Sequence, residues 1–229
     1  MTFLRRSAIA AATAVALAAC SSGPRVPDWQ MNAKQSLDRA QAAYLSGRDQ
    51  VEKTEFARAR DQIAGTGKVD LIIRIELARC AARAAALSFS DCPGFEALRG
   101  DATAADIAYA SYLAGRAQPA DAALLTEPQR AVLAAAGDEA AARAIAAIAD
   151  PLSRLVAAGA VFRANRATPE VLKTAVDTAS EQGWRRPLVA WLNVQALRAE
   201  KAGDAEEAAR LRRRIALIEG EPKGLPPGS

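Results

Sequence analysis

The sequence predicts an all-α fold, an array of antiparallel helix pairs. Alanine, the residue with the highest helix propensity, is very abundant, and aromatic residues make up only 5% of the chain. Residue patterns typical of helix starts and helix ends alternate along the sequence. No apolar–polar alternation bounded by turn residues indicates a β-strand. A chain of 229 residues is long enough for one sizeable domain or a short solenoid of such pairs.

Residues 1–19 have the features of a secretory signal peptide. Arg5 and Arg6 give a basic start, and residues 7–19 form an apolar, alanine-rich run. This run is too short for a transmembrane helix, which needs about 20 apolar residues. The length, the basic flank and the small residues at its end predict a cleaved export signal.

The run ends in Leu17-Ala18-Ala19-Cys20, which resembles the lipobox of bacterial lipoproteins. The resemblance implies cleavage before Cys20 and attachment of fatty-acyl chains, palmitate among them, as a lipid anchor in a membrane. Ser21, not aspartate, follows the cysteine. By resemblance to enteric lipoproteins this favours the periplasmic face of the outer membrane over retention in the inner membrane. The alternative is an ordinary secretory signal cut after an Ala-x-Ala site, with Cys20 incidental.

Short segments flank the predicted helical domain, which spans residues 29–219. Residues 20–28 hold the predicted lipidated cysteine and a stiff tether with two prolines, and eight extended residues span at most about 28 Å. Residues 220–229, rich in glycine and proline, predict a disordered tail.

The domain between them is predicted to be helical throughout. The expected helices lie near 30–46, 50–64, 69–87, 103–114, 127–136, 139–149, 151–164, 169–182, 185–202 and 205–219. Three of their starts resemble capping boxes: Asp49 with Glu52, Thr126 with Gln129, and Asp204 with Glu207. Two others place a cap residue before a proline: Asp150-Pro151 and Thr168-Pro169. Glycines mark the expected ends: Gly47, Gly65, Gly115, Gly137, Gly183 and Gly203.

Two segments resemble the tetratricopeptide repeat, a 34-residue helix–turn–helix. Residues 191–219 carry the small, turn and packing residues of that family: Ala196, Ala199, Gly203-Asp204, Glu207-Ala208 and Ile215. Residues 37–60 carry Ala40, Tyr44, Gly47, Phe56 and Ala59, with Glu52 where the family prefers alanine. The resemblance implies a tetratricopeptide-like solenoid, and an irregular helical bundle is the alternative. The whole chain also resembles uncharacterised proteobacterial lipoproteins, which implies no activity.

Cys80 and Cys92 are the two cysteines besides Cys20. After a helix ending near Leu87, the chain is able to fold back and bring Cys92 beside Cys80, so a disulfide is expected in an oxidising periplasm. The alternative is two separate small buried residues.

Several side chains are candidates for binding a partner. A helical wheel places Arg74 near the middle of an apolar face, either lining a groove or paired internally with a carboxylate. Trp184, Arg185 and Arg186 form either a peptide-binding ridge or an ordinary first turn. Tyr109 and Tyr112, three residues apart, either line a groove or pack as core. The arginine cluster, Arg210, Arg212, Arg213 and Arg214, either contacts anionic lipid or is solvated.

The composition argues against several kinds of chemistry. The chain has no histidine, which removes the commonest general base and the usual zinc ligand, so no metal site and no cofactor are expected. No catalytic motif, no phosphate-binding loop and no small-molecule site are indicated. Cleavage before Cys20 lowers Lys+Arg from 30 to 28 against 26 acidic residues, and the net charge from +4 to +2, so nucleic-acid binding is not expected.

These observations predict a non-enzymatic, lipid-anchored scaffold or adaptor that docks other cell-envelope proteins. A structural spacer without a binding groove is the alternative. An accessory factor of peptidoglycan or lipid metabolism is a weaker one.

Overall fold

A computed structural model of the chain describes residues 26–220. The predicted signal peptide, Cys20, Ser21 and residues 221–229 of the predicted tail lie outside the described residues. Within them the protein is all-α, and the described part contains no strand. None of the described helices is both long enough and apolar enough to cross a membrane.

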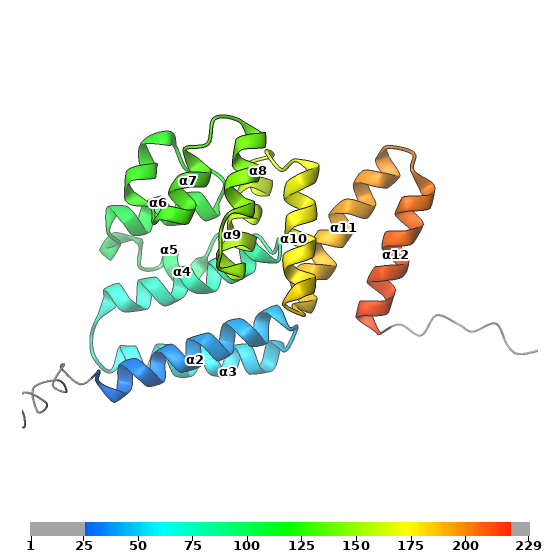
Figure 1. Cartoon of the computed structure of the whole chain (residues 1–229). Helices are drawn as coiled ribbons and strands as arrows, with labels where there is room; N and C mark the ends of the chain where they lie inside the picture. The colour runs from blue at the N-terminus through cyan, green and yellow to red at the C-terminus, as the bar shows by residue number, and fades with distance from the viewer. Residues whose placement is uncertain (1–25, 221–229) are drawn as a thin grey trace, which may run out of the picture.

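The helices follow the predicted order closely (Figure 1). The α-helices are α2 (Asp28–Leu45), α3 (Asp49–Ala64), α4 (Val69–Ala85), α5 (Pro93–Glu96), α6 (Ala104–Leu113), α7 (Glu127–Leu133), α8 (Asp138–Ala146), α9 (Pro151–Arg163), α10 (Pro169–Glu181), α11 (Arg185–Lys201) and α12 (Ala205–Glu219). Two 3₁₀ helices, η1 (Arg99–Asp101) and η2 (Pro119–Leu124), complete the described elements.

The helices form three neighbouring groups around α4. In Figure 1, α2 and α3 make an antiparallel hairpin along one edge, and α4 lies between this hairpin and α5 to α9. The helices α10, α11 and α12 continue from α9 as a row of successive antiparallel neighbours. The architecture is therefore an array of helix pairs packed against a central helix.

The close crossing of α4 and α9 is the centre of the main core. A Cβ atom on Gly159 of α9 would overlap the carbonyl group of Ala84 on α4, so only glycine permits this approach. Leu155, Trp191 and Leu192 are fully buried in the same core. A separate, smaller cluster around Phe56 joins the α2–α3 hairpin to α4.

Three of the predicted helix caps are confirmed. Asp150 accepts a hydrogen bond from the Ser153 N–H at 2.7 Å, and Asp204 accepts one from the Glu207 N–H at 3.0 Å. Thr168 accepts one from the backbone N–H of Val171 at 3.4 Å, as the Thr-Pro pair predicted.

The predicted capping boxes, in contrast, are not formed. Asp49 lies inside the first turn of α3, and Glu52 is buried against α4 instead of returning to the backbone. Thr126 bonds the side chain of Gln129, not its N–H. Glu207 pairs with Arg210 at 2.6 Å. In each case a side-chain partner competes with the backbone.

A capping box that was not predicted forms at the start of α6. Thr103 accepts a hydrogen bond from the Asp106 N–H at 3.2 Å, and Asp106 accepts one from the Thr103 N–H at 3.0 Å. Aspartate stands here where glutamate or glutamine is usual. The short elements α5, η1 and η2 were also not predicted, because three to six residues carry too little periodicity to detect.

One glycine does not end a helix as predicted: Gly137, with φ of +92°, precedes α8 as its N-cap. Gly65 does end α3 as its C-cap, in a right-handed conformation. Gly47 and Gly203, with φ of +80° and +77°, do turn the chain between α2 and α3 and between α11 and α12. Both of these hairpins bury small residues where the repeat resemblance placed them, Ala40 and Ala59 in one and Ala196 and Ala208 in the other.

Candidate functional site

A groove of about 350 Å³ runs over α4 and is bounded by α2, α6 and α9. We call it the α4 groove and define it by six of its lining residues: Gln41, Arg74, Leu77, Tyr109, Asp150 and Val156. Each wall comes from a different part of the chain, so the groove exists only in the folded protein.

The floor of the α4 groove is apolar and its rim is polar. Leu77 and Val156 are 3% and 2% exposed, and the small residues Ala78 and Ala81 leave the space above α4 open. Gln41 reaches across from α2 and donates a hydrogen bond from Nε2 to the carbonyl oxygen of Ala78 at 3.4 Å. An apolar floor with a few polar groups at the edge is the usual composition of a binding groove.

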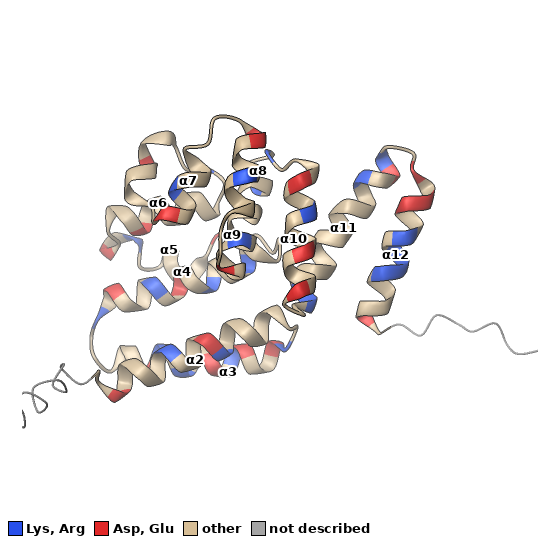
Figure 2. Ribbon diagram, in the orientation of Figure 1, with Lys and Arg blue, Asp and Glu red and all other residues tan. Residues whose placement is uncertain are grey.

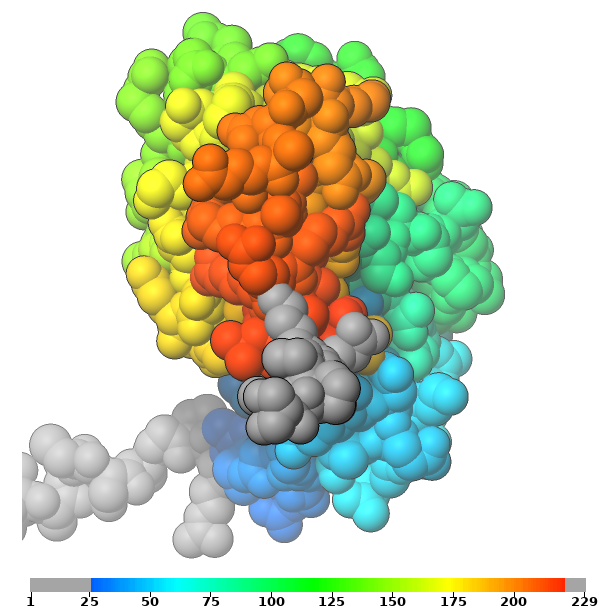
Figure 3. Space-filling model, turned by 90° about the vertical axis from the view of Figure 1, so that its right-hand side faces the viewer, coloured from blue at the N-terminus to red at the C-terminus, as the bar shows by residue number. Residues whose placement is uncertain are grey.

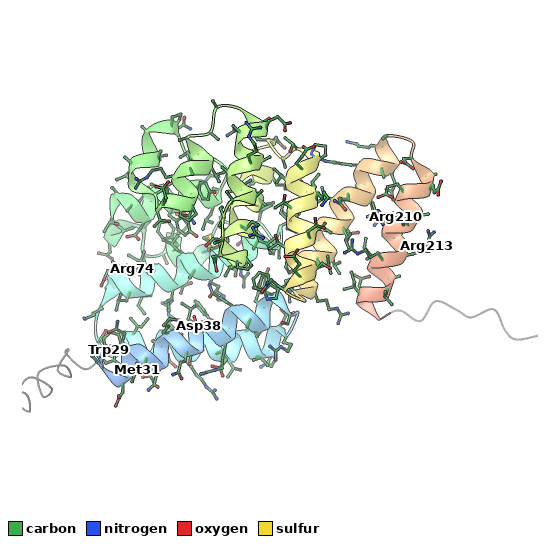
Figure 4. All side chains as sticks on the ribbon, in the orientation of Figure 1. Trp29, Met31, Asp38, Arg74, Arg210 and Arg213 are labelled. Carbon is green, nitrogen blue, oxygen red and sulfur yellow. A yellow bond between two sulfur atoms is a disulfide. The ribbon has the colours of Figure 1, made fainter. Side chains whose placement is uncertain are left out.

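Arg74 lies at the rim of this groove and not on an apolar face, so the helical-wheel placement was wrong. Its side chain is 67% exposed, and Nη2 lies 3.9 Å from a carboxylate oxygen of Asp70, one turn earlier on α4. The wheel failed because α4 is covered on several sides: Ile72, Ile73 and Ile75 are all buried around it. Figure 4 shows Arg74 near the start of α4. Of the two alternatives given for Arg74, the structure has it beside a groove and not in an ion pair with a neighbouring helix.

Glu76 of α4 is a buried carboxylate that the helical wheel does not predict. A wheel of α4 places it on a polar face with Arg79 and Arg83, but in the structure it is 6% exposed and pairs with Arg60 of α3. Gly94 leaves room for its carboxylate, since a Cβ there would overlap it. The pair therefore fastens α3 to the middle of α4.

Tyr109 and Tyr112 do share a face of α6, but they reach different spaces. Their rings stack with centroids 6.3 Å apart and an interplanar angle of 13°. Tyr109 lines the α4 groove, and burial raises its pKa to about 12. Tyr112 is buried and lines a separate cavity of about 240 Å³ between α6, α7 and α9. Burial also raises the pKa of Tyr112.

Trp184, Arg185 and Arg186 make contacts within the protein. Trp184 is partly buried beside Tyr44 and Leu45 of α2. Arg185 donates to the carbonyl oxygen of Glu219, the last residue of α12, at 2.9 Å. Arg186 lies 4.4 Å from the ring centre of Tyr44 and joins the start of α11 to the α2–α3 hairpin.

Cys80 and Cys92 lie together, as their spacing predicted. Their sulfur atoms are within bonding distance and their Cα atoms are 5.8 Å apart. Cys92 adopts the left-handed conformation, with φ of +46°, directly before α5. The pair ties α5 to α4 and closes over the buried ring of Phe95.

A second groove, of about 500 Å³, lies between α10 and α12 with α11 as its base. We call it the α10–α12 groove. Leu172, Val176 and Leu211 form its apolar floor, and Arg198, Arg210 and Arg214 line it from α11 and α12. Bands of basic residues along α12 are visible in Figure 2. The sequence identified two of these arginines only as part of a cluster, and it gave no indication that Arg198 lies beside them.

Among residues 26–220 no group of three or more histidine, cysteine, aspartate or glutamate side chains is placed to hold a metal ion. Two carboxylates, Asp106 and Asp150, do line the α4 groove. Both accept backbone hydrogen bonds as helix caps, Asp106 from Thr103 and Asp150 from Ser153. Their positions are therefore explained by helix capping.

Residues that complete the two grooves from other helices could not be read from the sequence. Gln41 of α2 and Arg198 of α11 carry no local pattern that separates them from ordinary surface residues. Their positions depend on how the helices pack. Comparison of the chain with protein-family models, with curated proteins and with solved structures finds no match.

Proposed function

We propose that the protein is a lipid-anchored, non-enzymatic scaffold of the bacterial envelope that docks other envelope proteins in its α4 groove. The observation that carries the proposal is this groove, an open trough with an apolar floor that α2, α4, α6 and α9 build together. A groove between packed helices suits the burial of apolar side chains from a partner segment.

The rim of the α4 groove supports recognition of a polypeptide. The ion pair between Arg74 and Asp70 is long, at 3.9 Å, and both side chains are more than half exposed. Such a pair contributes little to stability, so Arg74 is free to turn to a partner's carboxylate. Tyr109 also lines the groove, and its hydroxyl can donate a hydrogen bond to a partner.

The proposed anchor supports the assignment to the envelope. The lipobox-like motif ends at Cys20, and α2 begins at Asp28. Eight residues reach at most about 28 Å, so the helical body would stay near the outer-membrane surface. A scaffold held there would meet membrane-bound and periplasmic partners.

The anchor is tested by metabolic labelling with an alkyne-modified palmitate. We expect the label in the wild-type protein and none in Cys20→Ala, which removes the acylated sulfur. Cys80→Ala with Cys92→Ala serves as the matched cysteine control and should keep the label. Absence of label from the wild type would contradict the lipid anchor while leaving the groove untouched.

The docking role is tested by photo-crosslinking in intact cells. A benzophenone amino acid replaces Arg74 or Tyr109 in the groove, and Arg143 on the exposed face of α8 as a control. We expect one defined crosslinked partner from both groove positions and none from position 143. An even ladder of abundant envelope proteins from all three positions would favour the structural spacer instead.

A further inference from the structure

The α10–α12 groove shares no lining residue with the α4 groove, and its charge differs. Four basic side chains line it, Lys173, Arg198, Arg210 and Arg214, against two acidic ones, Asp177 and Glu207. Figure 3 views this end of the molecule, with α12 at the front and α10 beside it. The groove is therefore a basic, apolar-floored surface at one end of the helix row.

Two of the four cations are already neutralised. Lys173 pairs with Asp177 at 2.6 Å, and Arg210 donates from Nε and Nη2 to the two carboxylate oxygens of Glu207, each at 2.6 Å. The hydrogen bond from Arg210 lowers the pKa of Glu207, which keeps that pair charged near neutral pH. These two pairs form one edge of the groove on α10 and one on α12.

Arg198 and Arg214 are different, because neither lies within 4.0 Å of a carboxylate among residues 26–220. Arg198 donates to the backbone oxygen of Ala167 at 2.9 Å, just before α10 begins. Arg214 donates to the hydroxyl of Ser180 at 3.3 Å, near the end of α10. Two uncompensated guanidinium groups thus mark opposite ends of the groove, separated by nearly the length of α10.

The apolar part of the surface lies between and beside these two arginines. Leu172, Val176 and Leu211 line the floor. Leu217 follows Arg210 by two turns on α12 and is 79% exposed, the most exposed large apolar side chain among the described residues. An occupant that suits this surface carries apolar residues between two carboxylates.

The backbone of the groove restricts the form of the occupant. Residues 169–219 are helices joined by short turns, so no strand edge is present there to pair with an extended peptide. The lining contains no aromatic side chain, which proline-rich ligands require. The remaining mode is an amphipathic helix whose apolar face lies in the groove.

We propose that the α10–α12 groove binds an acidic amphipathic α-helix of a partner protein. Its carboxylates meet Arg198 and Arg214, and its apolar residues lie on Leu172, Val176 and Leu211. The two arginines contact residues 167 and 180, which at 1.5 Å per helical residue lie about 20 Å apart. The two acidic residues of the partner therefore lie three to four helical turns apart on one face.

The probe is a fluorescein-labelled helical peptide of about 20 residues with two glutamates at that separation and leucines between them. The control peptide has lysines in place of the two glutamates. Fluorescence anisotropy with the full chain in mild detergent should show binding of the glutamate peptide, weakened by added salt, and at least about tenfold weaker binding of the lysine peptide.

Variants of the protein then locate the site. Arg198→Glu and Arg214→Glu should each weaken binding of the glutamate peptide about tenfold, and the double variant should bind the lysine peptide better than wild type does. Arg213→Glu is the matched control, since it makes the same charge change on the exposed face of α12, outside the groove (Figure 4). Circular dichroism checks that each variant folds. If Arg214→Glu does not fold, Arg214→Gln is used in its place.

Three outcomes would overturn the proposal. Equal binding of the two peptides would show that the groove does not recognise the carboxylates of the peptide. Equal weakening by Arg213→Glu and Arg214→Glu would show nonspecific attraction. No peptide binding, together with sedimentation on phosphatidylglycerol vesicles that needs Arg210, Arg213 and Arg214 alike, would assign the face to a lipid surface. None of these results bears on crosslinking at the α4 groove.

Discussion

Buried carboxylates hold the N-terminal helices in place. Glu52, Glu55 and Glu76 are all less than a tenth exposed, although glutamate is rarely buried without a partner. Each has an arginine from another helix: Arg79, Arg39 and Arg60 respectively. The partners lie 16 to 27 residues away in the sequence, beyond the reach of a helix-period pattern. A wheel therefore treats such glutamates as solvent-facing, and only the packing of α2, α3 and α4 shows them buried.

Glu52→Ala tests how much one such carboxylate contributes to the free energy of unfolding. Glu52 accepts hydrogen bonds from Arg79 at 2.7 and 3.3 Å, and its removal leaves two partly buried arginines, Arg79 and Arg83, without it. We expect urea denaturation to show a loss of about 3 kcal/mol in the free energy of unfolding. Glu127→Ala, which removes a 78% exposed partner of Arg130, should cost less than about 0.5 kcal/mol. Equal costs would contradict a special role for the buried pair.

Tyr109 gives the protein a predictable response to alkaline pH. Burial raises its folded-state pKa to about 12, whereas in the unfolded chain the pKa is about 10. The neutral hydroxyl therefore favours folding fully below pH 10, and this contribution falls as the pH rises from 10 to 12. Urea denaturation between pH 9 and 11 should show a smaller loss of stability for Tyr109→Phe than for wild type. Parallel pH dependence of the two proteins would contradict the raised pKa.

At the scale of the elements, the sequence predicts helices well and their contacts poorly. Proline-flanked caps such as Asp150 and Thr168 are local, because both partners lie within one turn, and the structure has them as predicted. The start of α3 was predicted to within one residue, but its capping box was wrong because Glu52 pairs with Arg79 of α4 instead of the backbone. The α4 groove is likewise predicted only in part. Arg74 and Tyr109 are candidates from the sequence, while the positions of Leu77, Val156 and Gln41 in the groove depend on helix packing.

The contact between α4 and α9 depends on Gly159. An alanine there would overlap the Ala84 carbonyl, and both groups belong to rigid helix backbones. We expect Gly159→Ala to lower the free energy of unfolding by about 1–3 kcal/mol, because the helices must move apart. Gly100→Ala is the matched control, since nothing lies within 4 Å of a Cβ at that position in η1. Thermal denaturation of the two variants compares them directly, and similar melting temperatures would contradict the close crossing.

The cysteine pair fixes α5 against α4 across a separation of 12 residues. Closing a loop of this size stabilises a fold by about 3 kcal/mol in the chain-entropy model. We expect Cys80→Ala with Cys92→Ala to lower stability by a similar amount and to loosen residues 88–101 first. Unreduced peptide mapping of the wild type should recover the linked peptides, while quantitative alkylation of both thiols in the folded protein would exclude the bond.

At the scale of the whole molecule, the α2–α3 hairpin lies outside the main core. Its apolar cluster around Phe56 is separate from the main core. A second small apolar cluster packs Tyr44 and Leu45 of α2 against Ala82 of α4. Polar contacts complete the attachment: arginine–carboxylate pairs to α4, and the link from Arg186 of α11 to Tyr44 and Asp49. Polar, partly exposed links are weaker and more sensitive to salt than buried apolar ones. Since α2 forms one wall of the α4 groove, movement of the hairpin would change the width of that groove.

Arg186 tests whether the hairpin opens as a unit. Its Nε donates to the Tyr44 carbonyl at 2.7 Å, and its guanidinium lies over the Tyr44 ring. We expect Arg186→Ala to remove about 1–2 kcal/mol of local stability, so that hydrogen exchange rises several-fold in residues 28–64 and stays unchanged in α9 and α10. Arg185→Ala, which removes only the bond to Glu219 at the far end of α12, should leave the hairpin protected. A uniform rise across all helices would mean that the hairpin and the body unfold together, and that the α4 groove has a fixed width.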